Sequence, residues 1–233
     1  MLLSLLLACT TPEAEAPTCE PATCADVAAE CGSIDDGCGG TLTCGTCVDA
    51  WICNEVNVCE EPCTPLAAVF FDLGGTLVLE QESGLFAEAP DARPLIGALR
   101  DRGLPVGIIT NVERGWTIED LEALLEDPSF LDLFDVILLS SEAESRPKPD
   151  PRIYAEALAL LPDPPPIEQT AFVTEEIGDI AEAEPPTRGA RGAGMIGVHV
   201  SDEAPDVLAD HTIATDALLS IASAAWVECI EAE

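Results

Sequence analysis

The chain has 233 residues, enough for one domain of moderate size with a small additional unit. Its formal net charge is −35, from 44 acidic and 9 basic residues, and such a surface repels nucleic acid and anionic lipid, which excludes both as partners held by charge. Hydrophobic residues make up 48% of the chain, which excludes global disorder. We interpret the acidic surface as a solvated coat rather than as a binding site for cations or basic proteins.

The first 18 residues have the pattern of an export signal followed by a tether. The apolar stretch in MLLSLLLAC is far shorter than the roughly 20 residues of a membrane-spanning helix, but it suits the core of a secretion signal, although no basic residue precedes it. Its end, Leu-Leu-Ala-Cys, resembles the lipobox of bacterial lipoproteins. That resemblance implies a signal peptide at 1–8, a linker at 9–18, and a lipid on Cys9 as the only membrane contact. The alternative is a wrongly assigned start codon and no export.

A cysteine-rich segment follows at 19–63. Eight of the eleven cysteines lie between Cys19 and Cys59, with Gly-rich turns and few large apolar side chains. So small a unit cannot be stabilised by burial alone and requires cross-links. The spacing of Cys44 and Cys47 also suits half a zinc site or a redox pair. However, no His is nearby, and a redox pair normally opens a helix in a thioredoxin-like fold. Disulfides are therefore the favoured interpretation.

Part of this segment, CGSIDDGCGGTLTCGTC, resembles a module that recurs in exported proteins of myxobacteria. The resemblance implies a stalk or surface-binding element without catalysis, and with the lipobox it implies an outer-membrane or cell-surface lipoprotein of a Gram-negative bacterium. Four internal bridges would use all eight cysteines and leave Cys63 and Cys229 unassigned. Because domain termini often lie close together, we expect these two to form a bridge.

The main domain, at 66–228, alternates short apolar runs with helical patterns. This alternation predicts an α/β fold with a Rossmann-like parallel sheet and helices on both of its faces. Strands are expected at Ala67–Phe71, Pro105–Ile109, Val136–Leu139, Ala171–Val173 and Met195–Val200. Helices are expected at Pro94–Arg102, Ile118–Glu126, Pro151–Leu160 and Asp216–Trp226.

Polar residues follow four of the predicted strands. They are Asp72, Thr110, Ser140 and Glu175. Reactive groups in such folds lie just past the carboxyl ends of the strands, so these side chains are expected at one edge of the sheet. An aspartate after a strand is often only a turn former. Here, however, two glycines follow that allow a ligand to approach the backbone, and Thr76 can hydrogen-bond back to Asp72.

The first two of these strand ends resemble motifs of the haloacid dehalogenase (HAD) superfamily of hydrolases. FFDLGGTLV matches the first motif, with Asp72 at the position of the nucleophile. IITN matches the second motif, with Thr110 at the position of the hydroxyl group. The four motifs of the superfamily occur here in order between residues 66 and 200.

The third and fourth motifs are matched by Lys148, which precedes a proline, and by the pair Glu175 and Asp179. Lys148 is the only lysine in the chain. A lysine is usually a solvated surface charge, but all other basic residues here are arginines. A single lysine at this position indicates that a compact ammonium group is required there.

The resemblance implies a phosphatase in which Asp72 attacks a phosphoryl group and water hydrolyses the aspartyl-phosphate. Lys148 and Thr110 would be the other catalytic residues, one neutralising charge and one holding a phosphoryl oxygen. The substrate-binding residues would be Gly75, Thr76 and Asn111, with backbone amides near the first and last of these. Mg²⁺ would offset the repulsion between carboxylate and phosphate. Its ligands would be Asp72, the carbonyl group of Gly74, Glu175 and Asp179.

The chain departs from the superfamily pattern at Gly74, where active phosphatases usually have a second aspartate that protonates the leaving group. Loss of such acid–base assistance, typically worth about 10²–10⁴ in rate, predicts slow hydrolysis. Only 38 residues separate Asp72 from Thr110, and 38 separate Thr110 from Lys148, so neither gap has room for a cap domain. The uncapped site would admit a bulky phosphorylated substrate.

Three functions remain open on this basis. The first is the Mg²⁺-dependent phosphatase, and the second is a catalytically impaired, surface-anchored module that binds metal or phosphate. A dehalogenase is a weak third, because those relatives use a cap to desolvate the substrate. His199 and His211 are outside the motifs and are interpreted as structural or surface residues.

Overall fold

The structure is a computed structural model that describes residues 19–47, 52–60, 66–183 and 186–223. The chain divides into two compact units, 1–62 and 63–233, which are considered separately below. No helix in the described ranges is long and apolar enough to cross a membrane. The residues named above in the signal peptide and linker, with Cys9, Cys63 and Cys229, lie outside the described residues.

The N-terminal unit consists of two small antiparallel ribbons, β1 (Gly32–Asp35) with β2 (Thr41–Gly45) and β3 (Ile52–Cys53) with β4 (Cys59–Glu60). Four disulfides link it, and they use all eight cysteines between residues 19 and 59, as expected. The pairs are Cys19–Cys38, Cys24–Cys44, Cys31–Cys53 and Cys47–Cys59.

The two cysteines of the CxxC sequence are not paired with each other, since Cys44 bonds to Cys24 and Cys47 to Cys59. This pairing argues against a redox centre. The sulfurs of Cys31, Cys47 and Cys53 lie within 4.8 Å of one another, but disulfide sulfurs cannot act as thiolate ligands of a metal. The cross-links therefore point to an oxidising environment.

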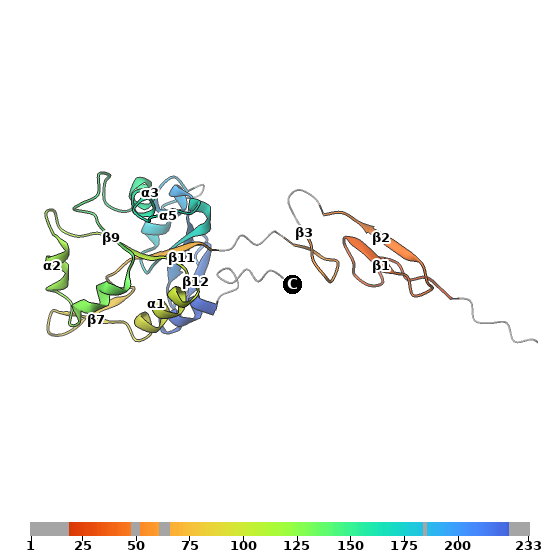
Figure 1. Cartoon of the computed structure of the whole chain (residues 1–233), viewed down its shortest axis with the longest axis horizontal. Helices are drawn as coiled ribbons and strands as arrows, with labels where there is room; N and C mark the ends of the chain where they lie inside the picture. Colours follow the sequence, from red (N-terminus) through yellow and green to blue (C-terminus); the bar gives the residue numbers. More distant parts are fainter. Residues whose placement is uncertain (1–18, 48–51, 61–65, 184–185, 224–233) are drawn as a thin grey trace, which may run out of the picture. The chain divides into compact units, whose positions relative to one another are not determined.

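The main domain is built on a six-stranded sheet in which every neighbouring pair of strands is parallel (Figure 1). Its strand order is β12-β11-β10-β5-β8-β9. The strands are β5 (Ala68–Phe71), β8 (Val106–Thr110), β9 (Val136–Leu139), β10 (Thr170–Thr174), β11 (Ile196–Val200) and β12 (His211–Ile213). The chain runs from β5 towards one edge and then returns past β5 to build the other edge. Ligands of open parallel sheets bind where the order reverses in this way.

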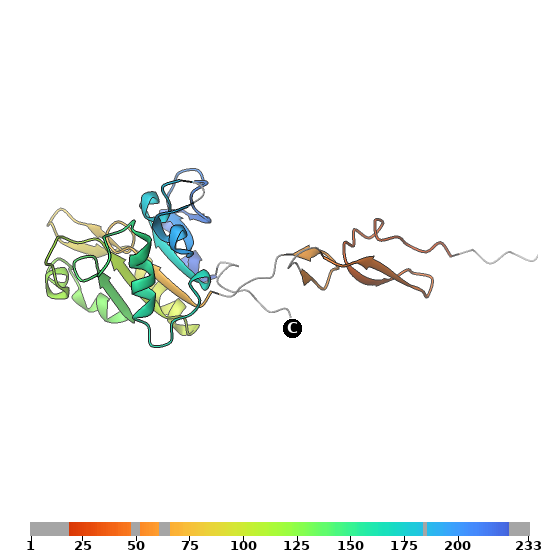
Figure 2. The same ribbon diagram turned by 90° about the horizontal axis from the view of Figure 1, so that it is seen from above.

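Helices cover both faces of the sheet, as predicted from the sequence (Figures 1 and 2). Side chains alternate along β5, so Val69 and Phe71 join one buried cluster while Phe70 joins the other. The first cluster contains the apolar side of α1 (Ala92–Asp101), and the second contains that of α3 (Pro151–Ala159). These two cores fix the strand ends that carry the polar residues.

The remaining helical segments are short. They are α2 (Ile118–Glu122), α4 (Ile177–Ile180) and α5 (Gly189–Ala193), with 3₁₀ helices at Pro128–Leu133, Ile167–Gln169 and Thr215–Ser223. The last of these was expected as an α-helix, but it contains non-helical backbone at Ala217. The rest of that predicted helix lies outside the described residues.

A hairpin that was not expected from the sequence follows β5 and explains why α2 is short. It pairs β6 (Val78–Glu80) with β7 (Phe86–Glu88). The predicted helix at 118–126 ends at Glu122 because the next residues pair with β7: the Phe86 amide donates to the Leu124 carbonyl, and the Glu126 amide donates to that of Phe86. Between β5 and β9 the described chain has, apart from the sheet strand β8, only this hairpin, α1, α2 and one 3₁₀ helix, so no cap domain is inserted there.

Candidate active site

The carboxyl edge of the sheet brings the predicted catalytic residues into one cleft of about 280 Å³. Asp72 directly follows β5, Thr110 ends β8, and Glu175 directly follows β10, the three strands at the centre of the sheet. The loop before α3 contributes Lys148, and α4 contributes Asp179. The full lining is Asp72, Gly74, Thr110, Asn111, Lys148, Glu175, Glu176 and Asp179.

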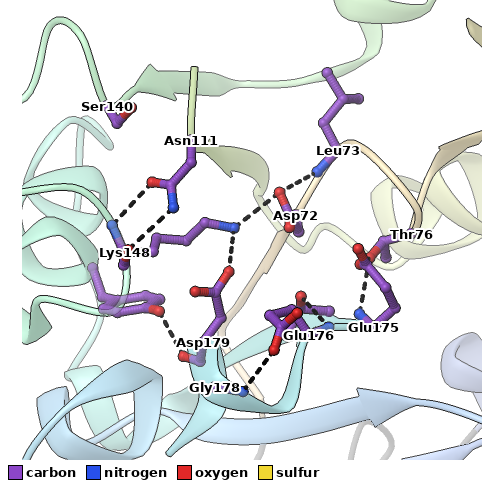
Figure 3. A network of polar contacts seen from close by, with 12 residues as sticks. Asp72, Leu73, Thr76, Asn111, Ser140, Lys148, Glu175, Glu176, Gly178 and Asp179 are labelled. Atoms are coloured by element: carbon purple, nitrogen blue, oxygen red, sulfur yellow. Dashed lines mark hydrogen bonds and ion pairs between the residues drawn. The ribbon is translucent and has the colours of Figure 1, made fainter. Parts of the chain in front are cut away.

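Lys148 lies between two carboxylates at the centre of this cleft (Figure 3). Its Nζ is 2.9 Å from Oδ1 of Asp72 and 2.7 Å from Oδ2 of Asp179, and its side chain is only 1% exposed. Burial raises the pKa of the Asp179 carboxyl, and the charge of Lys148 opposes that shift. The positive charge of Lys148 therefore offsets part of the negative charge of two poorly hydrated carboxylates.

The backbone of Lys148 is held by Asn111, the residue that follows β8. The Asn111 side chain donates from Nδ2 to the Lys148 carbonyl (3.1 Å) and accepts at Oδ1 from the Lys148 amide (3.0 Å). This two-way bond ties the loop before α3 to the end of β8. The side chain of Asn111 thus positions Lys148, and only its backbone amide is available for the substrate-binding role expected from the sequence.

Thr76 contacts Glu175 and not Asp72, which corrects the hydrogen bond expected from the sequence. Its hydroxyl donates to the Glu175 carboxylate and accepts from the Glu175 amide at 3.1 Å. Burial raises the pKa of the Glu175 carboxyl, and this hydrogen bond opposes the shift. Asp72 is steadied instead by the amide of Leu73, which donates to its Oδ1 at 2.7 Å.

Three residues outside the cleft lining support it. The Tyr154 hydroxyl, buried on α3, donates to the backbone carbonyl of Asp179 at 2.6 Å, and the same burial raises the pKa of Tyr154. Nε2 of His199 lies 3.0 Å from the backbone carbonyl of Glu175. Ser140, which follows β9, accepts from the Val112 amide at 2.9 Å and so braces the loop after β8.

Comparison with known proteins gives one family match inside the main domain and partial matches to curated relatives. Residues 84–184 match the model of the haloacid dehalogenase-like hydrolase family, a range that begins after Asp72 and Gly74. A protein named as a phosphatase from Mycobacterium tuberculosis is 38% identical over 109 residues, which are 46% of this chain and 43% of the relative. The haloacid dehalogenase-like hydrolase domain-containing protein 3 of Bos taurus is 36% identical over 104 residues, 45% of this chain and 36% of the relative. These matches span less than half the length of either relative.

Solved structures match over more of the chain. An L-2-haloacid dehalogenase superposes with a TM-score of 0.53 at 18% identity, covering 69% of this chain and 100% of that one. A HAD phosphatase from Thermococcus onnurineus gives 0.52 at 17% identity, with 68% and 97% covered. The fold is that of the HAD-like hydrolases. The sequence matches within the domain likewise support a HAD-like hydrolase.

Two adjacent glycines in the loop after β5 differ in whether the structure requires glycine at that position. Gly75 has a φ of +76°, and a Cβ at this position would overlap the Glu175 carboxylate, so a larger residue would be strained and would have to displace Glu175. The Gly75 amide, which was expected to hold phosphoryl oxygens, donates instead to the Val78 carbonyl at 2.8 Å. Gly74 lies outside the positive-φ region, and no atom lies within 4 Å of a Cβ built there. The backbone therefore does not require glycine at residue 74.

The cleft has the donor chemistry of a site for a hard divalent cation. Asp72, Glu175 and Asp179 line it with Lys148 as their only cationic neighbour, which leaves negative charge uncompensated. Carboxylate and carbonyl oxygens are the ligands that Mg²⁺ prefers. The three carboxylates do not bring oxygens within 4.8 Å of one another in the described part of the chain, and Asp179 is paired with Lys148. The donors expected from the sequence, namely the carboxylates of Asp72, Glu175 and Asp179 and the carbonyl group of Gly74, line one cleft, and their placement around a cation remains a prediction.

Replacing Lys148 with Met should lower the free energy of unfolding by about 3–5 kcal/mol, because Asp72 and Asp179 would lose the cation that they share. Urea unfolding monitored by circular dichroism measures this loss. The matched control is Arg152→Met, which removes a solvent-exposed arginine from its pair with the partly buried Asp150 and should cost at most about 1 kcal/mol. Equal losses in the two variants would contradict this account of Lys148.

Proposed function

We propose that this chain is an exported HAD-like hydrolase, a Mg²⁺-dependent phosphatase that uses Asp72 as its nucleophile. The observation that carries the proposal is the placement of Lys148 between Asp72 and Asp179 at the carboxyl edge of the sheet. A buried lysine at this place serves no packing need that an apolar residue could not meet. It does orient Asp72 and place a positive charge beside it, which favours attack by this carboxylate on a phosphate.

The geometry suits attack by one particular oxygen of Asp72. Oδ1 is held by the Leu73 amide and by Lys148, whereas Oδ2 makes no recorded hydrogen bond or ion pair with the described residues. We assign Oδ2 as the attacking atom. A P–O bond forms to Oδ2, and the bond from phosphorus to the leaving oxygen breaks. Water then attacks phosphorus, which releases phosphate and restores the carboxylate.

The neighbouring residues would hold the phosphoryl group during this transfer. Thr110, at the end of β8, and Asn111 line the cleft, and the hydroxyl of the first and the backbone amide of the second would bind the phosphoryl oxygens. Asp72, Glu175, Asp179 and the Gly74 carbonyl would hold Mg²⁺, which when bound offsets the repulsion between carboxylate and phosphate. Asp179 also pairs with Lys148 and so helps to fix its position. No side chain at residue 74 can protonate the leaving oxygen, so that oxygen takes its proton from solvent.

The proposed substrate is a phosphoester, and the uncapped cleft leaves room for a bulky one. The four disulfides support a place outside the cytoplasm. We further propose the lipid-anchored form at a Gram-negative outer membrane or cell surface, with Cys9 as the lipidation site. Labelling of the expressed chain with a radioactive fatty acid, and loss of that label in Cys9→Ser, tests the anchor.

The second candidate is a module that binds metal or phosphate without turnover. The observation that favours it is Gly74, which lines the cleft but has no side chain to transfer a proton to the leaving oxygen. The two candidates share the same cation site and differ only in whether product forms.

Removal of divalent metal tests the proposed function. Protein purified from an oxidising compartment should hydrolyse para-nitrophenyl phosphate with Mg²⁺ and lose that activity in EDTA. Mg²⁺ should also raise the melting temperature, because it binds only the folded state. A Mg²⁺-dependent melting shift without hydrolysis of any phosphoester would select the binding module. If Mg²⁺ produces neither hydrolysis nor a melting shift, both candidates are rejected.

A further inference from the structure

A second pocket, of about 490 Å³, adjoins the catalytic cleft on the side of the unexpected hairpin. The two share Gly74, Thr110 and Asn111 as lining residues. Most of its remaining wall is apolar and comes from β6, β7, the loop after β8, and the segment around α2. The large side chains of this wall are Val78, Phe86, Trp116, Leu121, Leu124 and Leu125.

The wall of this pocket is held by backbone hydrogen bonds, so it is present before any ligand binds. Phe86 and the segment at 124–126 are joined by the two amide-to-carbonyl bonds described above, at 2.8 and 2.9 Å. The opposite side is braced from the loop after β9, where the Ser141 hydroxyl donates to the Trp116 carbonyl at 2.7 Å. Pre-formed, largely apolar concavities are typical of small-molecule sites.

Gly74 forms the border between the two spaces. It lines both, and the space where its Cβ would lie is empty for 4 Å around. A group bonded to a phosphoryl oxygen beside Asp72 can therefore extend past residue 74 into the apolar pocket. An aspartate at this position would place a carboxylate at the mouth of that pocket.

The chemistry of the lining decides what can enter. Glu113 is the only charged residue among those that line the pocket, and its charge is negative. A nucleotide or a bisphosphate would bring a second anion into this space without a cation to meet it. A sugar would bring hydroxyl groups that need polar partners, but the wall offers mainly carbon. An uncharged aromatic ring fits.

We propose that the pocket at Phe86 and Trp116 holds the aromatic leaving group of an aryl phosphate. This inference rests on the proposed function, because it takes Asp72 as the nucleophile and the neighbouring cleft as the phosphoryl site. The same glycine then has two effects. It removes the acid that an alkyl alcohol would need, and it opens the way for a phenol, which leaves with little protonation.

The test measures binding and turnover separately, so that failure of the pocket and failure of catalysis can be told apart. Binding of naphthyl phosphate and of inorganic phosphate to the Asp72→Asn protein is measured by isothermal titration calorimetry in Mg²⁺. Turnover of naphthyl phosphate and of acetyl phosphate is measured with wild-type protein. Acetyl phosphate also has a good leaving group, but it is too small to fill the pocket.

Naphthyl phosphate should bind at least about tenfold more tightly than inorganic phosphate, and Phe86→Ala should remove about tenfold of its affinity and of its kcat/KM. Acetyl phosphate turnover should stay the same in Phe86→Ala. The matched control is Leu85→Ala, an exposed neighbour on the same hairpin that does not line the pocket. Trp116→Ala, on the opposite wall, should have the same effect as Phe86→Ala if the first variant folds poorly.

The proposed role of the pocket would be wrong if naphthyl phosphate and inorganic phosphate bound equally well. It would also be wrong if neither Phe86→Ala nor Trp116→Ala changed the turnover of naphthyl phosphate. In that case hydrolysis of acetyl phosphate would still support the proposed function. Tight naphthyl phosphate binding that Phe86→Ala weakens, combined with no turnover of either substrate, would establish the pocket and reject the phosphatase.

Discussion

Replacing Asp72 with Asn should reduce the hydrolysis of every phosphoester, on the order of 10⁴-fold or more, since loss of a nucleophile removes the covalent route altogether. The amide keeps the shape of the carboxyl group and can still accept from the Leu73 amide, so the fold should persist. Lys148 would retain its pair with Asp179. The measurement is the initial rate with para-nitrophenyl phosphate in Mg²⁺, with circular dichroism to verify folding.

The matched control for this variant is Asp163→Asn, which neutralises an exposed aspartate that does not line the catalytic cleft. Its rate should equal that of the wild type. Wild-type protein quenched in acid during turnover should carry phosphate on the peptide that contains Asp72. A rate in Asp72→Asn within tenfold of wild type would show that the carboxylate is not the nucleophile.

Replacing Gly74 with Asp should raise the hydrolysis of alkyl phosphates by about 10²–10⁴-fold, the usual worth of a positioned general acid. The structure permits the change, because the backbone at this residue is outside the positive-φ region and the space for a side chain is empty. Alkoxides are poor leaving groups and need the proton, whereas phenolates need little help. Aryl phosphate turnover should therefore not share this gain, and the ratio of the two rates is the measured quantity.

Gly74→Asn separates proton transfer from bulk, since Asn has the size of Asp but no acidic proton. It should leave alkyl phosphate hydrolysis at the wild-type level. Gly75→Asp should instead damage the cleft, because residue 75 has a φ of +76° and faces Glu175. An equal gain in the Asp and Asn variants would mean that the effect comes from filling space and not from acid catalysis.

The sequence predicted the sheet well because most of its strands are largely buried. β5, β8, β10 and the edge strand β9 are runs of apolar residues with polar residues just beyond, and the structure places each within a residue or two of the predicted bounds. β12 was missed because it is three residues long, half-buried, and begins with His211. The β6–β7 hairpin was missed because Glu-Gln-Glu at 80–82 offers little apolar alternation.

Within the site, the residues of the cleft were predicted from strand ends, but their contacts were not. Side-chain bonds between positions far apart in sequence, such as Asn111 with Lys148 or Thr76 with Glu175, leave no periodic signal. The apolar pocket was equally hidden, since its wall combines a hairpin, a loop and a helix end. An asparagine directly after a strand, beside the motif threonine, was the one available hint for a positioning residue.

The solitary lysine has a consequence for protein chemistry. Reagents that acylate or reductively alkylate ε-amines ordinarily modify many lysines on a protein surface, but here the only ε-amine belongs to Lys148, whose side chain is almost fully enclosed. Such reagents would act as probes of one cleft. The rate at which that amine is labelled would report how often the cleft opens, and protection by a bound phosphate ester would report its occupancy.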